Sequence, residues 1–201
     1  MIETALKPKV TEWISPLTDF LSQKGVSPNI ITFIGLGMSF LSAAAFALGY
    51  FKVAALFVTL SGLCDLFDGA VARSSGRGSV FGAFLDSCLD RLSEIMVFLG
   101  ICLYYLWAGE AVHILLLFLT LAGSLMVSYT KARSEGLDHE CKVGLMERSE
   151  RIILLILGGI AGPRYFPIIL SVLFILTWLT VFQRMHHSWQ LMENKRQSQH
   201  Q

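Results

Sequence analysis

Long apolar stretches alternate with short polar segments along this chain. A membrane-spanning helix needs about 20 mostly apolar residues, and six stretches can supply such helices. They are residues 31–50, 53–73, 80–107, 111–130, 152–162 and 166–183. The fifth stretch is short, and it reaches spanning length only if its helix begins near Leu145 and includes the charged residues from Glu147 to Arg151. The pattern predicts an all-α integral membrane protein with six transmembrane helices.

The two ends of the chain differ from these stretches. Residues 5–22 place apolar side chains at helical spacing on one face, which predicts an amphipathic helix that lies at the membrane interface or packs against the domain. Residues 191–201 are polar, and such a composition is typical of disorder. We therefore expect one membrane domain over residues 1–190, with residues 1–24 as its juxtamembrane part, followed by a disordered polar tail.

Composition narrows the class of protein. Of the 201 residues, 54% are hydrophobic and 15% are charged, against about 45–50% and about 25% in soluble domains. An ordinary soluble globular protein is therefore excluded. The net charge of +1 disfavours a nucleic-acid partner. The four cysteines show no CxxC spacing, so we expect free thiols rather than a disulfide or zinc framework.

The basic residues predict the orientation in the membrane. With six spans, 14 of the 16 lysines and arginines fall on the side that holds both termini, or in the adjoining half of a span. Lys52 and Arg164 fall on the opposite side. Because positive charge is retained in the cytoplasm, we expect a multi-pass protein of the inner membrane with both termini cytoplasmic.

Four aspartates lie within the second and third apolar stretches. Asp65 and Asp68 are three residues apart, and Asp86 and Asp90 are four apart, so each pair presents two carboxylates on one helix face. The short segment 74–79 joins the two helices, which places the pairs at similar depth. Divalent cations relieve the repulsion between such carboxylates. Oxygen ligands favour Mg²⁺, with Mn²⁺ as an alternative, and two ions about 3.5–4 Å apart suit phosphoryl transfer.

The aspartates alone leave two other interpretations open. The carboxylates can form a structural ion-pair network with Arg73, Arg77 and Arg91, although ionisable groups at membrane depth usually mark function. They can also line the path of a metal-cation transporter. Arg148 and Arg151 argue against a cation path, because they would repel its cargo.

The residues around the aspartates carry a longer motif. The chain reads D-L-F-D-G-A-V-A-R from Asp65 to Arg73 and, eight residues later, G-A-F-L-D-S-C-L-D from Gly82 to Asp90. This resembles the signature D-x-x-D-G-x-x-A-R-x8-G-x3-D-x3-D of the CDP-alcohol phosphotransferases (the class-I CDP-alcohol phosphatidyltransferase family), and every fixed position matches. Residues 27–32 are similar to the stretch that precedes the first span in that family.

The resemblance implies a fold and an activity. Family members have six transmembrane helices around a polar cavity open to the cytoplasm and usually form homodimers. They transfer a phosphatidyl or related group from a CDP-alcohol, such as CDP-diacylglycerol, to an acceptor hydroxyl and release CMP. The resemblance implies that two Mg²⁺ ions bind Asp65, Asp68, Asp86 and Asp90, and that Asp90 is also the general base. The implied contacts of the CDP-alcohol are Asn29, Ile30, Ile31, Thr32, Gly69, Arg73 and Ser79.

A second polar cluster, in the later stretches, concerns the acceptor. Cations beside a metal site favour an anionic acceptor, most simply a phosphorylated polyol, although basic residues near span ends are also ordinary flanking charges. The cluster resembles segments of the bacterial phosphatidylinositol-phosphate synthases. That branch implies an inositol 1-phosphate pocket at Lys131, Arg151 and Arg184, with Arg133 and Arg148 as further candidates.

The match to that branch has two departures. The loop 136–143 differs in length and composition, and Ser149 stands where the branch has proline. Phosphatidylglycerophosphate synthesis from glycerol 3-phosphate therefore stays as an alternative, as does an enzyme that uses an archaetidyl donor or CDP-inositol.

Overall fold

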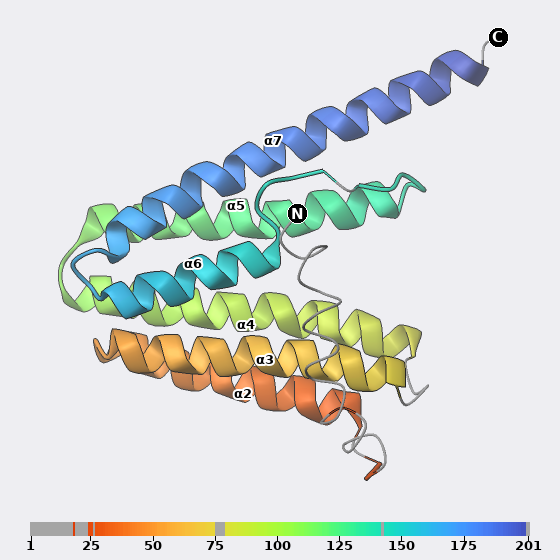
Figure 1. The fold of residues 1–201 in the computed structure, drawn as a ribbon. Helices are drawn as coiled ribbons and strands as arrows, with labels where there is room; N and C mark the ends of the chain where they lie inside the picture. Colours follow the sequence, from red (N-terminus) through yellow and green to blue (C-terminus); the bar gives the residue numbers. More distant parts are fainter. Residues whose placement is uncertain (1–17, 19–23, 26, 75–78, 142, 200–201) are drawn as a thin grey trace.

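The apolar stretches of the chain fold into helices that run side by side in a bundle (Figure 1). The computed structural model describes residues 18, 24, 25, 27–74, 79–141 and 143–199. The described residues form helices α2 (Pro28–Ala47), α3 (Phe51–Ser74), α4 (Val80–Trp107), α5 (Ala111–Glu135), α6 (Arg148–Ala161) and α7 (Phe166–Gln199). The all-α class is confirmed. The amphipathic helix expected over residues 5–22 lies almost entirely outside the described residues.

Local sequence explains where the helices begin and turn. α2 has Pro28 in its first turn, where the missing N–H of proline would have no helical partner. α4 begins after Ser79, whose hydroxyl accepts a hydrogen bond from the Gly82 N–H at 2.9 Å, as an N-cap residue does. Gly49 and Gly109 have positive φ and turn the chain after α2 and α4.

α6 begins later than the start near Leu145 that the fifth stretch needs to reach spanning length. Glu147 has extended backbone angles and caps the helix, which therefore starts at Arg148 and not near Leu145. The segment before it is held against α7, because the Met146 N–H donates a hydrogen bond to the Thr180 hydroxyl at 3.0 Å. This tertiary contact favours an extended loop where apolar periodicity alone favours more helix.

Four of the described helices are long and apolar enough to cross a membrane. They are α2, α3, α5 and the Phe166–Glu193 part of α7. α4 has 28 residues, but charged side chains interrupt its first half. α6 has 14 residues, which make about 21 Å of helix against a hydrocarbon thickness of about 30 Å. The helices are those of an integral membrane protein, and four of the six expected spans meet the length and composition of a membrane helix on their own.

α7 extends past the rest of the bundle towards the C-terminus (Figure 1). It has 34 residues, or about 51 Å of helix. Residues 191–199, where the composition predicts a disordered tail, continue this helix. Their Gln, Glu, Lys and Arg are good helix formers, and neither Gly nor Pro interrupts them.

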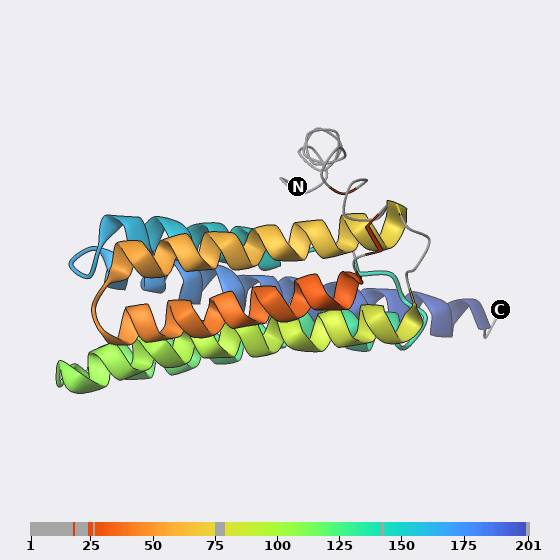
Figure 2. The ribbon, with the colours of Figure 1, turned by 90° about the horizontal axis from the view of Figure 1, so that it is seen from below.

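The packing around α2 places polar and apolar groups at opposite ends of the bundle. α2 packs against both α3 and α4 (Figure 2). α3 also packs against α6, and α5 pairs with α7. Phe46, Phe51 and Phe166 form a buried cluster with ring centroids 5.3–5.7 Å apart. These rings lie at the ends of α2 and α3 that are remote from the aspartates. The aromatic cluster thus anchors one end of the bundle and leaves the other end to polar residues.

The contact between α2 and α4 is close enough to test the fold. A Cβ atom at Gly100 would overlap the backbone of Ala43, whereas a Cβ atom at Gly37 of α2 has nothing within 4 Å. We expect Gly100→Ala to lower the free energy of unfolding by about 1–3 kcal/mol, because the two helices must separate. Gly37→Ala is the matched control and is expected to be neutral or stabilising by about 0.5–1 kcal/mol. Unfolding by SDS in detergent micelles measures both changes, and equal midpoints for the two variants would contradict the expectation.

Candidate active site

Three aspartates meet where α3 and α4 carry their acidic residues. Asp65 and Asp68 from α3 and Asp86 from α4 each offer an oxygen, and these oxygens all lie within 4.8 Å of one another. Spacing along each helix puts the carboxylates on the facing sides, as the sequence predicts. Three acidic oxygens this close repel one another strongly unless a cation lies between them.

Two oxygens of this acidic triad (Asp65, Asp68 and Asp86) lack a partner. Asp68 is only 3% exposed. Its Oδ2 and the Oδ1 of Asp86 are buried and have no hydrogen-bond partner among the described residues. Buried carboxylate oxygens without a donor are costly, and hard oxygen ligands suit Mg²⁺ or Mn²⁺. The triad therefore fits a divalent cation.

Asp90 has a different environment from the triad. Its Oδ1 lies 2.7 Å from Nη2 of Arg148, whose Nη1 lies 2.7 Å from Oδ2 of Asp65. The other oxygen of Asp90 is 3.6 Å from Arg91. Sequence reasoning considered Arg91 as a partner but missed Arg148 in this role. The structure therefore brings three of the four predicted metal ligands together and places the fourth beside a guanidinium group.

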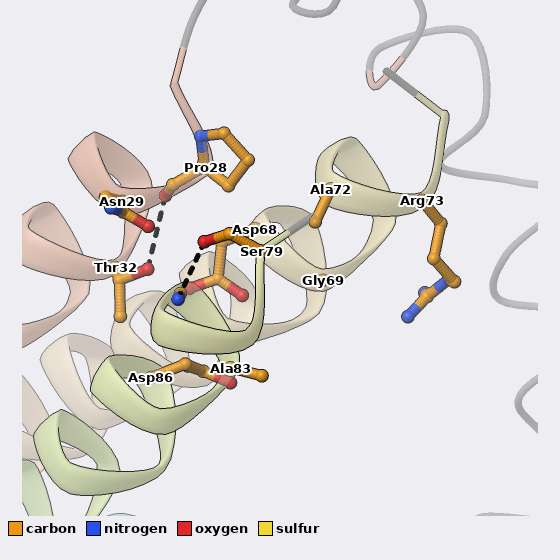
Figure 3. Close-up of a pocket in the computed structure, with 11 residues that line it drawn as sticks. Pro28, Asn29, Thr32, Asp68, Gly69, Ala72, Arg73, Ser79, Ala83 and Asp86 are labelled. Atoms are coloured by element: carbon orange, nitrogen blue, oxygen red, sulfur yellow. Dashed lines mark hydrogen bonds between the residues drawn. The ribbon is translucent and has the colours of Figure 1, made fainter. Parts of the chain in front are cut away.

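A polar cavity of about 230 Å³ opens beside the triad (Figure 3). It lies between the start of α2, the end of α3 and the start of α4. Asp68 and Asp86 form part of its wall, and Arg73 stands at its α3 side (Figure 3). Glycines bring polar groups close here, because a Cβ atom at Gly82 would lie 3.0 Å from the Ser79 hydroxyl and 3.5 Å from Oδ1 of Asn29. The cavity thus has acidic side chains that fit a cation and hydrogen-bonding groups at the same wall.

Most of the predicted CDP-alcohol contacts line this cavity. They are Asn29, Thr32, Gly69, Arg73 and Ser79. Ile30 and Ile31 are not among its lining residues. Ile30 is 54% exposed on the outer surface of the bundle, and Ile31 is buried in the core. Asn29 and Thr32 are three residues apart and share a helix face, which explains why the residues between them point elsewhere.

An apolar groove of about 460 Å³ approaches the aspartates from another side. It runs between α3 and α6 and is lined by Leu63, Leu66, Ile152, Ile153 and Ile156. Asp65, Asp90 and Arg148 also line it. The aspartates and Arg148 therefore lie between the polar cavity, which Asp68 and Asp86 line, and the apolar groove.

Arg151, a predicted acceptor contact, is engaged by protein groups. Its Nε donates a hydrogen bond to Oε1 of Glu94 at 2.9 Å, and its Nη2 donates one to Oε2 at 3.2 Å. Ser124 on α5 also donates a hydrogen bond to Glu94, at 2.5 Å. Arg151 is 2% exposed, and its Nη1 has no hydrogen-bond partner among the described residues. Glu94 was not predicted as a site residue, although it lies four residues after Asp90 on the same helix face.

Apart from Arg148, the other predicted acceptor contacts lie on two helices, α5 and α7. Arg184 is buried on α7, where its Nε donates a hydrogen bond to the Val143 carbonyl at 2.8 Å and its Nη1 donates one to the Val127 carbonyl at 2.6 Å. Lys131 is half-buried and Arg133 is exposed near the end of α5. Of the five predicted cations, Arg148 lines the groove beside the aspartates.

Comparison with known proteins gives a consistent family match. A family model described as CDP-alcohol phosphatidyltransferase matches residues 25–185. An archaetidylinositol phosphate synthase of Methanothermobacter thermautotrophicus is 38% identical over 188 residues, which cover 92% of each chain. A phosphatidylinositol phosphate synthase of Streptomyces avermitilis is 37% identical over 191 residues, covering 87% of this chain and 77% of the relative.

Solved structures agree with the sequence match. The crystal structure of Mycobacterium tuberculosis phosphatidylinositol phosphate synthase with CDP-DAG bound superposes with a TM-score of 0.80 at 30% identity, covering 87% of this chain and 92% of that chain. A second crystal structure of that enzyme, in complex with manganese and citrate, has the same TM-score and identity. Both the fold and the sequence are therefore shared with phospholipid-synthesising enzymes.

Proposed function

This chain belongs to the CDP-alcohol phosphatidyltransferase family, and we propose that it transfers a phosphatidyl-type group from a CDP-alcohol to a hydroxyl of a phosphorylated polyol, with release of CMP. As a member of the family it is a transferase of phospholipid synthesis. The position of the acidic triad, between the polar cavity and the apolar groove, carries the proposal. A cation-transport function has no support from this family.

The two cavities match the two halves of a lipid-linked nucleotide. The polar cavity offers Asn29, Thr32 and Ser79 for hydrogen bonds with the cytidine diphosphate group, and Arg73 for a phosphate. The apolar groove between α3 and α6 suits the lipid chains of CDP-diacylglycerol or a similar CDP-alcohol. The pyrophosphate then lies beside the aspartates, where the bond to CMP breaks.

The acidic groups divide into ligands and a base. Asp65, Asp68 and Asp86 would hold a first divalent cation, and Asp90 would help to hold a second. Bound Mg²⁺ or Mn²⁺ supplies positive charge for the pyrophosphate and for the transferred phosphoryl group. Asp90 accepts the proton of the acceptor hydroxyl at a carboxylate oxygen. Because a carboxylate beside cations is a weak base, positioning of the acceptor must contribute much of the rate.

The acceptor we propose is inositol 1-phosphate, bound by basic residues. The relatives named above are synthases of phosphatidylinositol phosphate and archaetidylinositol phosphate, and the chain carries the cations Lys131, Arg151 and Arg184, with Arg133 and Arg148 as additional contacts. Arg151 keeps an unpartnered Nη1 beside its pairing with Glu94, which leaves a donor for a phosphate oxygen. Arg148 is the cation that already lies next to Asp90.

We also propose how the chain sits in the membrane. α4 and α6 complete six transmembrane helices, with the charged start of each facing the inside of the bundle. Both termini and the aspartates lie on the cytoplasmic side of the inner membrane, where soluble acceptors and CMP are accessible. The N-terminal segment lies at the interface as an amphipathic helix, and the protein is a homodimer.

An assay of CMP release tests the proposed reaction. Purified protein in detergent is given CDP-diacylglycerol, Mg²⁺ and one acceptor at a time: inositol 1-phosphate, glycerol 3-phosphate, serine or inositol. We expect CMP release with inositol 1-phosphate and a phosphorylated lipid product, because a cluster of cations favours a charged acceptor over a neutral one. Release with glycerol 3-phosphate instead would keep the reaction class and replace the acceptor. If no acceptor gives CMP, the donor is wrong, and CDP-archaeol and CDP-inositol are the substrates to test next.

A further inference from the structure

Arg148 forms a bridge between two helices through their acidic residues. From the first position of α6, its Nη1 lies 2.7 Å from Asp65 on α3 and its Nη2 lies 2.7 Å from Asp90 on α4. These are the lengths of strong charge-assisted hydrogen bonds. One guanidinium group thus lies between two carboxylates and offsets part of the repulsion between them.

Few other groups hold Arg148 in this place. Its Nε is buried and has no hydrogen-bond partner among the described residues. The residue follows an extended loop and lines the apolar groove, whose volume of about 460 Å³ lies next to the side chain. The guanidinium group is therefore held mainly by two carboxylates and has space beside it into which it can move.

Asp65 belongs to two groups of charges at the same time. It contributes an oxygen to the acidic triad with Asp68 and Asp86, and it pairs with Arg148 together with Asp90. A divalent cation shared by Asp65 and Asp90 would use the same two carboxylates as the guanidinium group. Two positive charges cannot remain on these carboxylates without strong mutual repulsion.

On the basis of the metal centre proposed above, we infer that Arg148 is a displaceable internal cation that occupies the place of the second divalent ion at Asp65 and Asp90. Arrival of the second ion releases the guanidinium group into the groove, where it can bind a phosphate oxygen of a substrate. Metal loading and phosphate binding are coupled in this way, because one event frees the residue that the other uses. The first ion, at the triad, needs no such displacement.

Mn²⁺ binding to purified variants tests this inference without an activity measurement. Titration followed by electron paramagnetic resonance gives the dissociation constants of the tight and the weak ion. We expect Arg148→Met to tighten the weak ion by about tenfold or more, because the competing charge at Asp65 and Asp90 is removed. The tight ion shares only Asp65 with Arg148, so its affinity should rise by a smaller factor. Arg91→Met is the matched control. It removes the same charge 3.6 Å from the other oxygen of Asp90, where the guanidinium group is hydrogen-bonded to Ser87, and it is expected to tighten the weak ion less than about threefold.

A stability measurement gives a second readout. Without Mn²⁺, Arg148→Met is expected to unfold at a lower SDS concentration than the unaltered protein, since Asp65 and Asp90 lose their shared cation. With saturating Mn²⁺ the difference should disappear. Arg148→Lys, which cannot bridge both carboxylates as a fork, serves if the Met variant does not fold, and its weak ion should tighten by a smaller factor.

Several results would overturn the inference. Equal isotherms for the Arg148 and Arg91 variants would show that Arg148 does not compete with the ion. Weaker binding of the second ion in the Arg148 variants would make the residue a support of the metal site and not its competitor. If neither the variants nor the unaltered protein bound Mn²⁺, the proposed metal centre itself would be wrong. The first two outcomes leave the metal centre in place and reject only the competing role of Arg148.

Discussion

The Asp68→Asn variant is expected to release CMP about a hundredfold to a thousandfold more slowly than the unaltered protein. The change keeps the shape of the side chain and removes one negative charge. Asp68 is almost completely buried and its Oδ2 has no partner among the described residues, so this oxygen is left available to a cation. The substitution should also weaken the tight Mn²⁺ ion in a binding titration, because one of the three converging oxygens is lost.

Asp138→Asn is the matched control for this prediction. Asp138 is exposed and has a φ of 59°, a conformation that asparagine adopts readily. It should keep the turnover and the Mn²⁺ affinity of the unaltered protein. If Asp68→Asn retained turnover within tenfold of the control, Asp68 would not be a metal ligand in the reaction.

The second large effect concerns the buried ion pair between Glu94 and Arg151. Both side chains are less than a tenth exposed. We expect Glu94→Ala to lower the free energy of unfolding by about 3–5 kcal/mol, since it leaves a buried guanidinium group without its carboxylate. The double variant Glu94→Leu with Arg151→Met should recover much of this loss, because no charge then stays unpaired. SDS unfolding of the single and double variants measures both effects.

Glu110→Ala provides the comparison with a half-exposed acidic residue. Glu110 lies beside His113 with its side chain 50% exposed, and its loss should cost less than about 1 kcal/mol. If Glu94→Ala were no more destabilising than Glu110→Ala, the Glu94–Arg151 pair would not contribute to the stability of the bundle.

The sequence predicts the acidic site well because its information is local. Spacings of three and four residues put Asp65 with Asp68 and Asp86 with Asp90 on single helix faces, and the structure brings Asp65, Asp68 and Asp86 together. The same periodicity separates Asn29 and Thr32 from the two isoleucines between them. Residues 29–32 are contiguous in the family motif, but helical geometry directs only Asn29 and Thr32 into the cavity and turns Ile30 and Ile31 away from it.

Partners that are distant along the chain could not be predicted in this way. Arg148 meets Asp90, and Arg151 meets Glu94 across 57 residues, and no spacing rule links such positions. The start of α6 depends in the same way on a hydrogen bond from Met146 to Thr180 on another helix. Local propensity and periodicity therefore give the helices and the acidic faces, while the pairing of cations with carboxylates depends on tertiary packing.

The loop between α5 and α6 has an attachment of its own. The Val143 carbonyl accepts a hydrogen bond from Arg184 of α7, and the Met146 N–H donates one to Thr180 of α7. The acidic triad, in contrast, comes from α3 and α4. Substitutions in the loop or in α7 can therefore shift the start of α6, and with it Arg148 and Arg151, while α3 and α4 keep the backbone positions of the triad. With the acceptor bound by Arg148 and Arg151 as proposed above, selection for a new acceptor would act on this half of the molecule. A single scaffold would then diversify the headgroups of membrane lipids through one loop and the helix that holds it.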